Sequence, residues 1–293
     1  MSENSIVVLH YKTIDKTIEC VGSVLETTCD ANVYIVDNHS NDGTVQQLEN
    51  IYANNNRVQI IMVNDNIGFA RANNLAMRQL FAQGKKYAVI TNNDIVFQAG
   101  AINQLIDSLR KTNEVIVAAP RVISPNHVIQ NSVQPKRENA FKYLVHAIIP
   151  RKTNTFAESC SDTTCVEVFS GCCFACDLSK MHEIGYFDEY TFLYYEESIL
   201  SAKAKEKGFD IIYVPDSVVV HYHAASTKGI NEMVLGYMLD SELYYMQTYL
   251  RITPWIVSFY GAVKRRVHYK KYGSKLLFEM ESKAINRIRE RQK

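Results

Sequence analysis

Short β-branched apolar runs alternate with segments of helical periodicity at the start of the chain, and this alternation constrains the fold most. The apolar runs cover residues 5–11, 32–36, 58–63, 87–91 and 115–119. Apolar residues recur at helical spacing between them, over residues 14–25, 42–51, 68–81 and 101–109. Strands that alternate with helices through short links predict an α/β fold with a parallel, doubly wound sheet flanked by helices.

The rest of the chain is less regular. Residues 124–165 contain three prolines and few clear periods, which predicts loops and short strands. Further strands are predicted over residues 166–175, 211–214 and 218–222, and short helices over residues 178–184 and 198–206. From Ile230 onward the pattern is mostly helical. We therefore predict an α/β domain over residues 1–227 and a helical, basic extension over residues 228–293.

Composition and charge limit the classes of protein to consider. A chain of 293 residues with 47% apolar and 22% charged residues is typical of a globular protein with a sizeable core. The net charge of +1 hides an asymmetry, because the last 30 residues carry +8 and the preceding 263 carry −7. Neither a signal peptide nor an apolar stretch of spanning length is visible, so we expect a cytoplasmic protein.

The basic tail is the one candidate for contact with a membrane. Trp255, Phe259 and Tyr260 precede the cluster Lys264–Arg266, and further lysines follow. Aromatic residues beside basic clusters suit an anionic lipid surface, which would make the protein peripheral on the inner face of the cell membrane. A solvated helical face or an oligomer contact explains the same pattern equally well. Nucleic acid is disfavoured, because the charge is confined to a tail without a known binding module.

Seven cysteines are present, and five of them lie within residues 160–176. Zinc sites are usually built from regular pairs, and only Cys173 and Cys176 have such a spacing. Buried, reduced thiols are therefore the preferred interpretation, with zinc as the alternative.

Polar clusters follow four of the predicted strands, where ligands bind in open α/β sheets. They contain Tyr11, which could stack on a base, Asp37, which could accept a hydrogen bond from a pyrimidine, Gly68 at a helix start, and Asp94. A carboxylate that leaves a strand suits a divalent cation with a diphosphate. Each cluster alone is ordinary turn or capping chemistry. Four such clusters at one edge of one sheet instead favour a site that binds a nucleotide diphosphate.

These motifs resemble family 2 glycosyltransferases with the GT-A fold, in particular their rhamnosyltransferase-like branch, over residues 5–227. The family's pyrimidine-binding Asp corresponds to Asp37, and its N-x-G-F-A-x-x-N segment to Asn66–Asn73. Its metal-binding D-x-D position reads Asn92-Asn93-Asp94. The resemblance implies a nucleotide-binding set and makes Asp94 the ligand of Mg²⁺ or Mn²⁺. That set comprises Tyr11, Asp37, Asn66, Gly68, Asn73 and Asn93.

The second half adds a segment that resembles the acceptor side of the family. Gly171–Phe174 matches the lining segment, and Gly185–Glu189 followed by Tyr194–Glu197 resembles the G-x-F-D-E … Y-x-E-D signature. The second acid of that signature is usually the catalytic base, which implies Glu197, with Glu196 as the alternative. Glu stands at 197 where the family has Asp, and Ile199 and Lys203 also depart from the pattern.

The resemblance also implies a second metal ligand or diphosphate contact at His221, with His223 as an alternative two residues on. The expected activity is inverting, metal-dependent transfer of a sugar from dTDP-rhamnose or a UDP-sugar. The expected acceptor is a glycan hydroxyl, on a polyprenyl-diphosphate carrier, in the synthesis of a surface polysaccharide such as capsule or O-antigen. Two alternatives are an inactive nucleotide-sugar-binding scaffold and a sugar nucleotidyltransferase. The latter usually has a Gly-rich loop after its first strand, which is absent here.

Overall fold

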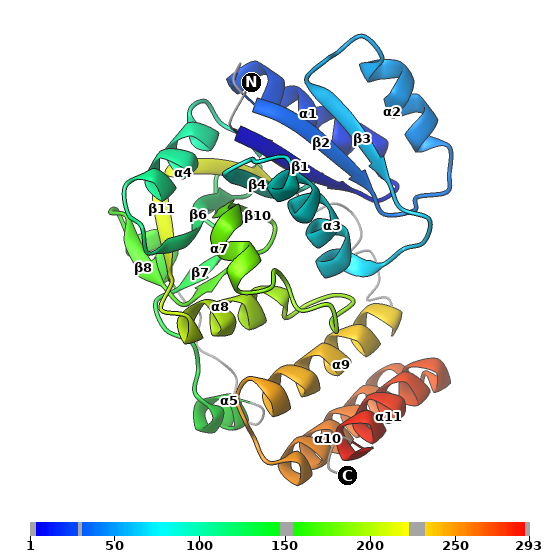
Figure 1. Ribbon diagram of the computed structural model, residues 1–293. Coiled ribbons are helices and arrows are strands. Elements are labelled where there is room, and N and C mark those ends of the chain that lie inside the picture. The colour runs from blue at the N-terminus through cyan, green and yellow to red at the C-terminus, as the bar shows by residue number, and fades with distance from the viewer. Residues whose placement is uncertain (1–3, 29–30, 147–154, 223–231, 291–293) are drawn as a thin grey trace.

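A computed structural model describes residues 4–28, 31–146, 155–222 and 232–290 of the chain. A nine-stranded mixed sheet, flanked by helices, forms one part of this structure, and a layer of C-terminal helices lies beyond it (Figure 1). The predicted α/β fold is confirmed.

The N-terminal half follows the predicted alternation of strands and helices. Strands β3, β2, β1 and β4 are parallel neighbours in that order. The predicted ends are correct to within two residues for most of these elements, and β6 extends further than predicted. The elements are β1 (Asn4–His10), α1 (Ile14–Thr27), β2 (Ala31–Asp37), α2 (Thr44–Tyr52), β3 (Val58–Met62), α3 (Gly68–Ala82), β4 (Tyr87–Asn92), β5 (Ile95–Phe97), α4 (Ala101–Arg110) and β6 (Val115–Ile123).

The middle of the chain departs from the prediction in three places. Residues 124–165, predicted as loops and short strands, also contain two short helices. The single strand predicted over residues 166–175 is wrong, because the chain there crosses from a small sheet, where β9 pairs with β7, into the large sheet. The two strands predicted over 211–222 form one bent strand, since Pro215 falls at a register shift instead of a turn. The elements are β7 (Val133–Gln134), α5 (Ala140–His146), α6 (Phe156–Ser159), β8 (Thr164–Val166), β9 (Val168–Phe169), β10 (Cys173–Asp177), α7 (Leu178–Glu183), α8 (Glu196–Glu206) and β11 (Asp210–His221).

The sheet is parallel only in part. Strand β10 lies between β4 and β6 and is antiparallel to both, while β5 and β8 are antiparallel to β11. Alternating side chains of the strands bury both faces of the sheet. Ile6 and Val8 of β1 belong to the core that α1, α2 and α4 cover, and Val7 to the core that α3, α7 and α8 cover.

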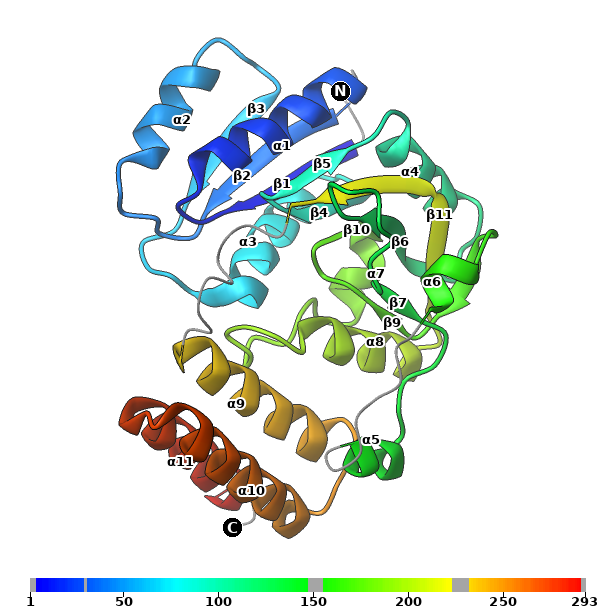
Figure 2. The ribbon, with the colours of Figure 1, turned by 180° about the vertical axis from the view of Figure 1, so that it is seen from behind.

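The C-terminal extension forms a third core of its own. Its helices are α9 (Glu232–Thr248), α10 (Pro254–Tyr272) and α11 (Lys275–Glu290), and α9 lies between the other two and the sheet domain (Figure 2). Tyr143 of α5 and Ile199 of α8 are buried in this core together with residues of all three helices. None of the described helices has the length and apolarity needed to cross a bilayer. The predicted domain boundary at 227/228 lies outside the described residues and stays a prediction.

Four of the described cysteines, Cys20, Cys172, Cys173 and Cys176, are buried thiols as predicted. Cys165 is exposed, so the prediction of burial is wrong for that residue. Within the described ranges no three His, Cys, Asp or Glu side chains converge on a metal position.

Candidate active site

The carboxyl ends of three parallel strands meet at one edge of the sheet. His10 at the end of β1 pairs in register with Asp37 at the end of β2, and Leu9 pairs with Asn92 at the end of β4. The loops after these strands carry most of the residues predicted to bind the nucleotide. The sequence clusters therefore lie together, as the predicted sheet requires.

Asp94 and His221 are brought together from distant parts of the chain. The antiparallel pairing of β5 with β11 places Ile95 opposite His221, and the N–H of Tyr222 donates to the carbonyl of Asp94 at 2.9 Å. His221 Nε2 then lies 3.4 Å from Asp94 Oδ2. The alternative ligand His223 lies outside the described residues.

Gln130, which no sequence motif singles out, fixes the ring of His221. Its side-chain Oε1 lies 3.2 Å from His221 Nδ1, while its Nε2 donates to the backbone carbonyl of the same histidine at 3.4 Å. An amide oxygen can only accept, so Nδ1 donates this hydrogen bond and Nε2 is the ring nitrogen that faces Asp94.

The base-binding candidates differ in exposure. The Tyr11 side chain is exposed, whereas Asp37 is buried. The Asp37 carboxylate accepts hydrogen bonds from the backbone N–H and the hydroxyl of Ser40, at 3.1 and 2.5 Å. Ser40 Oγ accepts in turn from the N–H of Lys12 at 2.8 Å. Asp37 thus joins the loops after β1 and β2, and any contact to a base adds to these bonds.

Asn38 and Asn66 join the loops after β2 and β3. The amide of Asn38 donates to Asn66 Oδ1 at 3.0 Å and accepts from the N–H of Ile67 at 3.0 Å. Gly68 follows with a left-handed φ of 82°, and a Cβ there would lie 2.5 Å from the carbonyl oxygen of Phe192. Only glycine lets α3 begin this close to the backbone at Phe192, in the loop that leads to Glu196 and Glu197.

The two remaining asparagines of the predicted set bond to nearby groups. Asn73 donates to the carbonyl of Phe69 at 3.0 Å, within α3. Asn93 donates to the hydroxyls of Thr13 and Thr17, at 2.8 and 2.9 Å, and so ties the start of α1 to the loop that carries Asp94. The structure thus gives both side chains a local structural role, and their contact with a nucleotide stays a prediction.

Glu196 and Glu197 occupy the first turn of α8. The two residues before them, Tyr194 and Tyr195, both have left-handed φ, of 72° and 70°. Such a conformation in a bulky residue costs about 1–3 kcal/mol, and two in succession persist only where surrounding contacts hold them. The strained turn aims both carboxylates inward at the start of the helix.

Gly171 holds the carboxylate of Glu197. Its N–H donates to Glu197 Oε1 at 2.8 Å, and a Cβ on Gly171 would lie 2.5 Å from that same oxygen. The next residue, Cys172, accepts a hydrogen bond from the N–H of Asn92 at 2.8 Å. One short segment therefore connects Glu197 to the loop that carries Asp94.

The buried thiol of Cys172 is influenced by both acids. Burial raises the pKa of Cys172 to about 12, opposed by a hydrogen bond to Ser170 and reinforced by the charges of Asp94 and Glu197.

The two acids differ in what acts on their pKa. Burial raises the pKa of Glu196 to about 8, and the charge of Glu197 adds to this effect. Burial also raises the pKa of Glu197, while backbone N–H groups at the start of the helix and at Gly171 favour its ionised form. The hydrogen bond from Gly171 thus makes Glu197 the stronger candidate for a base, and this role stays a prediction.

Helix α9 clamps the loop before the two acids, a role that the sequence pattern did not predict. Tyr244 donates to Asp188 Oδ2 at 2.7 Å, and Ser241 donates to the carbonyl of Leu193 at 3.0 Å. The rings of Phe192 and Tyr237 stack at 4.3 Å between centroids. The extension is thus part of the framework of the site.

Known proteins resemble this chain in sequence. The model of glycosyl transferase family 2 matches residues 5–183. The chain belongs to this family. An N-acetylglucosaminyl-diphospho-decaprenol L-rhamnosyltransferase of Mycobacterium tuberculosis is 25% identical over 219 residues, which cover 69% of this chain and 70% of that protein. The glycosyltransferase assignment and the likeness to a rhamnosyltransferase are therefore confirmed.

Solved structures resemble the glycosyltransferase in fold. GalNAc-T7 with UDP, GalNAc and Mn²⁺ matches 96% of this chain with a TM-score of 0.63 and 18% identity, and this chain spans 54% of that one. The mannosyltransferase PcManGT of Pyrobaculum calidifontis with GDP-Man and Mn²⁺ matches 96% with a TM-score of 0.59 and 16% identity, over 73% of that chain. Both matches support the predicted GT-A fold.

Gly171→Ala tests the position of Glu197 without removing an acid. The new methyl group displaces the carboxylate, and a misplacement of about 1 Å costs roughly 10²-fold in kcat. Some stability should be lost as well, because the displaced carboxylate loses the hydrogen bond from the Gly171 N–H, so Tm is measured beside kcat. Gly22→Ala is the matched control, because a Cβ there meets nothing within 4 Å. Equal kcat values for the two variants, measured with equal Tm, would contradict this role of Gly171.

Proposed function

We propose that the glycosyltransferase moves a sugar from a nucleotide-diphosphate donor to a hydroxyl of a glycan acceptor, with inversion, and that Glu197 is its base. The observation that carries this proposal is the connection from the strand end at Asn92, two residues before Asp94, through Cys172 and Gly171 to Glu197. It joins a carboxylate at the nucleotide edge of the sheet to a carboxylate that is held by a backbone N–H.

The residues at the sheet edge fit a divalent cation. A carboxylate and a neutral imidazole, 3.4 Å apart and on rigid strand ends, are ligands that Mn²⁺ accepts and Mg²⁺ tolerates. Asp94 and His221 would hold the ion, and Gln130 would orient the imidazole. Bound there, the ion supplies positive charge against the leaving diphosphate. Two protein ligands leave room for phosphate oxygens of the donor.

Glu197 and Glu196, on the acceptor side, have different parts in the proposed proton transfer. Glu197, ionised, accepts the proton of the acceptor hydroxyl as that oxygen attacks the anomeric carbon. Glu196 is buried beside it, and burial together with the charge of Glu197 raises the pKa of Glu196, which disfavours a second negative charge there. One direct displacement inverts the anomeric carbon, unlike a hydrolase, whose paired acids activate water.

The sequence relative supports a narrower choice of substrates. Its name describes transfer of L-rhamnose to N-acetylglucosaminyl-diphospho-decaprenol. We propose dTDP-rhamnose as the donor, with a UDP-sugar as the second candidate, and a sugar on a polyprenyl-diphosphate carrier as the acceptor. The product would enter a surface polysaccharide such as capsule or O-antigen. Membership of the family disfavours the alternative of a nucleotidyltransferase.

The pH dependence of transfer distinguishes the two acids. Glu197→Gln should lower kcat by about 10²–10⁴-fold, the usual contribution of a general base. Glu196→Gln should keep most of the activity, since burial and the charge of Glu197 disfavour the ionised form of Glu196 and the neutral amide preserves its size. Because burial raises the pKa of Glu197, kcat/KM of the wild type should fall with acid at a pH above the usual range of a carboxyl group. An inactive scaffold would give no transfer in any of the three proteins, and an inactive Glu196→Gln beside an active Glu197→Gln would exchange the roles.

The metal site is testable without turnover. Mn²⁺ with dTDP or UDP should raise the Tm of the wild type, because ligands that bind the folded state stabilise it. Asp94→Asn should abolish this rise, and Gln130→Ala should weaken metal affinity by about 10–100-fold, as loss of an orienting partner does. Gln59→Ala, an exposed amide on β3, is the control. Metal affinity of Asp94→Asn equal to that of the wild type would remove Asp94 from the site.

We also propose that α10 contacts the anionic inner face of the membrane, where a lipid-linked acceptor would lie. Four apolar residues at intervals of four, Trp255, Phe259, Val263 and Val267, are 68, 69, 48 and 55% exposed. Arg266, Lys270 and Lys271 are exposed on the same helix. An exposed apolar stripe beside basic side chains matches an interfacial helix in both hydrophobicity and charge.

Binding to vesicles tests this surface. Trp255→Ser with Phe259→Ser should weaken binding to phosphatidylserine-containing vesicles by at least about tenfold, because two aromatic anchors are lost. The wild type should bind neutral vesicles less well, and salt should weaken its binding. Met62→Ser, which removes an equally exposed apolar residue on β3, should have no effect. If the double variant instead changed only the oligomeric state, α10 would be a contact between copies.

A further inference from the structure

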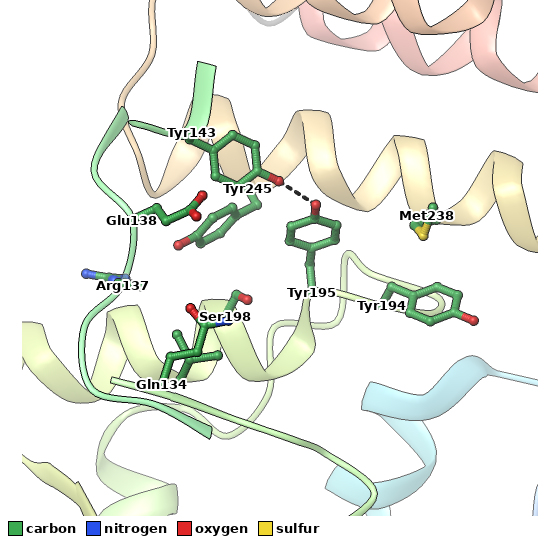
Figure 3. Close-up of a pocket in the computed structure, with 10 residues that line it drawn as sticks. Gln134, Arg137, Glu138, Tyr143, Tyr194, Tyr195, Ser198, Met238 and Tyr245 are labelled. Atoms are coloured by element: carbon green, nitrogen blue, oxygen red, sulfur yellow. Dashed lines mark hydrogen bonds between the residues drawn. The ribbon is translucent and has the colours of Figure 1, made fainter. Parts of the chain in front are cut away.

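A pocket of about 230 Å³ lies between the sheet domain and the C-terminal helices (Figure 3). It is built by segments that are distant in sequence. Gln134 is the last residue of β7, and Arg137 follows that strand. Tyr195 and Ser198 lie at the start of α8, and Met238 belongs to α9. None of these residues is in the predicted nucleotide site.

The pocket adjoins the two acids along the chain. Tyr194 and Tyr195, which line it, lie directly before Glu196 and Glu197 on the strained turn, and Ser198 follows them. Residues of the wall therefore flank both acids in the sequence, so a ligand in the pocket lies next to the turn that carries Glu197.

Aromatic side chains form a rigid wall of the pocket. Tyr245 is buried, with its ring centroid 6.2 Å from that of Tyr143 and 5.5 Å from that of Tyr195. The hydroxyls of Tyr143 and Tyr195 are hydrogen-bonded to each other (Figure 3). Tyr143 also donates to the buried Glu242 at 2.9 Å. Side chains held in this way keep the shape of the pocket in the absence of a ligand.

The chemistry of the wall indicates the class of ligand. Tyrosine rings and Met238 suit the apolar faces of a pyranose, while Gln134 and Ser198 can bond its hydroxyls. Arg137 and Glu138 line the pocket with opposite charges, so the wall has no net charge that would select a phosphate. The volume is below the roughly 300–1,000 Å³ typical of sites for larger ligands, which favours a single ring.

We propose that this pocket binds a neutral pyranose ring of the acceptor and presents the adjoining hydroxyl to Glu197. The proposal rests on the proposed function and adds to it the place and the chemical class of the acceptor sugar. It also gives the extension a direct part in acceptor selection, because α9 contributes Met238 and Tyr245 to the wall.

Filling the pocket tests the proposal without touching the acids. Met238→Trp adds bulk from the α9 side, and Met233→Trp is the matched control, an exposed methionine on the same helix outside the pocket. Binding of free hexoses and N-acetylhexosamines to the full chain is measured by saturation-transfer NMR without donor. KM for donor and for acceptor, and the Tm of each variant, are measured beside it.

Met238→Trp should abolish sugar binding and raise the acceptor KM by at least about tenfold, with the donor KM and Tm close to those of the wild type. Met233→Trp should match the wild type in all four measurements. Sugar binding and acceptor KM unchanged in Met238→Trp would overturn the proposal, as would an equal rise in donor KM. A protein that binds sugar in this pocket but transfers none would refute the proposed function and leave the pocket assignment standing.

Discussion

The hydrogen bond from the Gly171 N–H to the Glu197 carboxylate is the interaction on which the site depends. It lets an ionised group persist in a partly buried position, because a charge taken from water needs such a partner. It also fixes the distance between the segment before β10 and the start of α8, two parts of the chain that no sheet pairing joins. The cost is the loss of any side chain at position 171, since a Cβ would collide with the carboxylate.

The strained turn before α8 needs a second set of contacts, which the C-terminal helices supply. Tyr195 has a left-handed φ and is held through its hydroxyl by Tyr143, which also bonds to Glu242 of α9. Glu242 is buried and paired with Lys264 of α10 at 2.5 Å. Removing one partner of such a buried pair is costly, because the other charge is left uncompensated. A lysine of the basic tail therefore supports the turn that presents the acids, beyond any contact it makes with lipid.

Local patterns in the sequence predicted one side of the site well and the other poorly. The strands that end at His10, Asp37 and Asn92 follow from β-branched runs and from the rule that parallel strands share an edge. The role of Gln130 could not be predicted, since it depends on the pairing of β11 with β6, which brings His221 beside a residue 91 positions earlier. The break in the strand predicted over residues 166–175 was missed for a similar reason, because an apolar run does not reveal which of two sheets it joins. Resemblance to the family pointed to Glu197 with Glu196 as the alternative, and the structure adds that the Gly171 N–H binds the carboxylate of Glu197.

The two sides of the site are built by different kinds of interaction, and this difference has a consequence for specificity. The nucleotide side consists of short loops bonded to one another through Asp37, Asn38 and Asn93, so a substitution there disturbs several bonds at once. The pocket beside the acids is instead formed where α9 packs against α8. Side chains on α9 that line the pocket, such as Met238, can change without altering the loops that we propose to hold the donor and the metal ion. If the pocket takes the acceptor as proposed, acceptor preference can vary among proteins with this framework while the loops at the sheet edge stay the same.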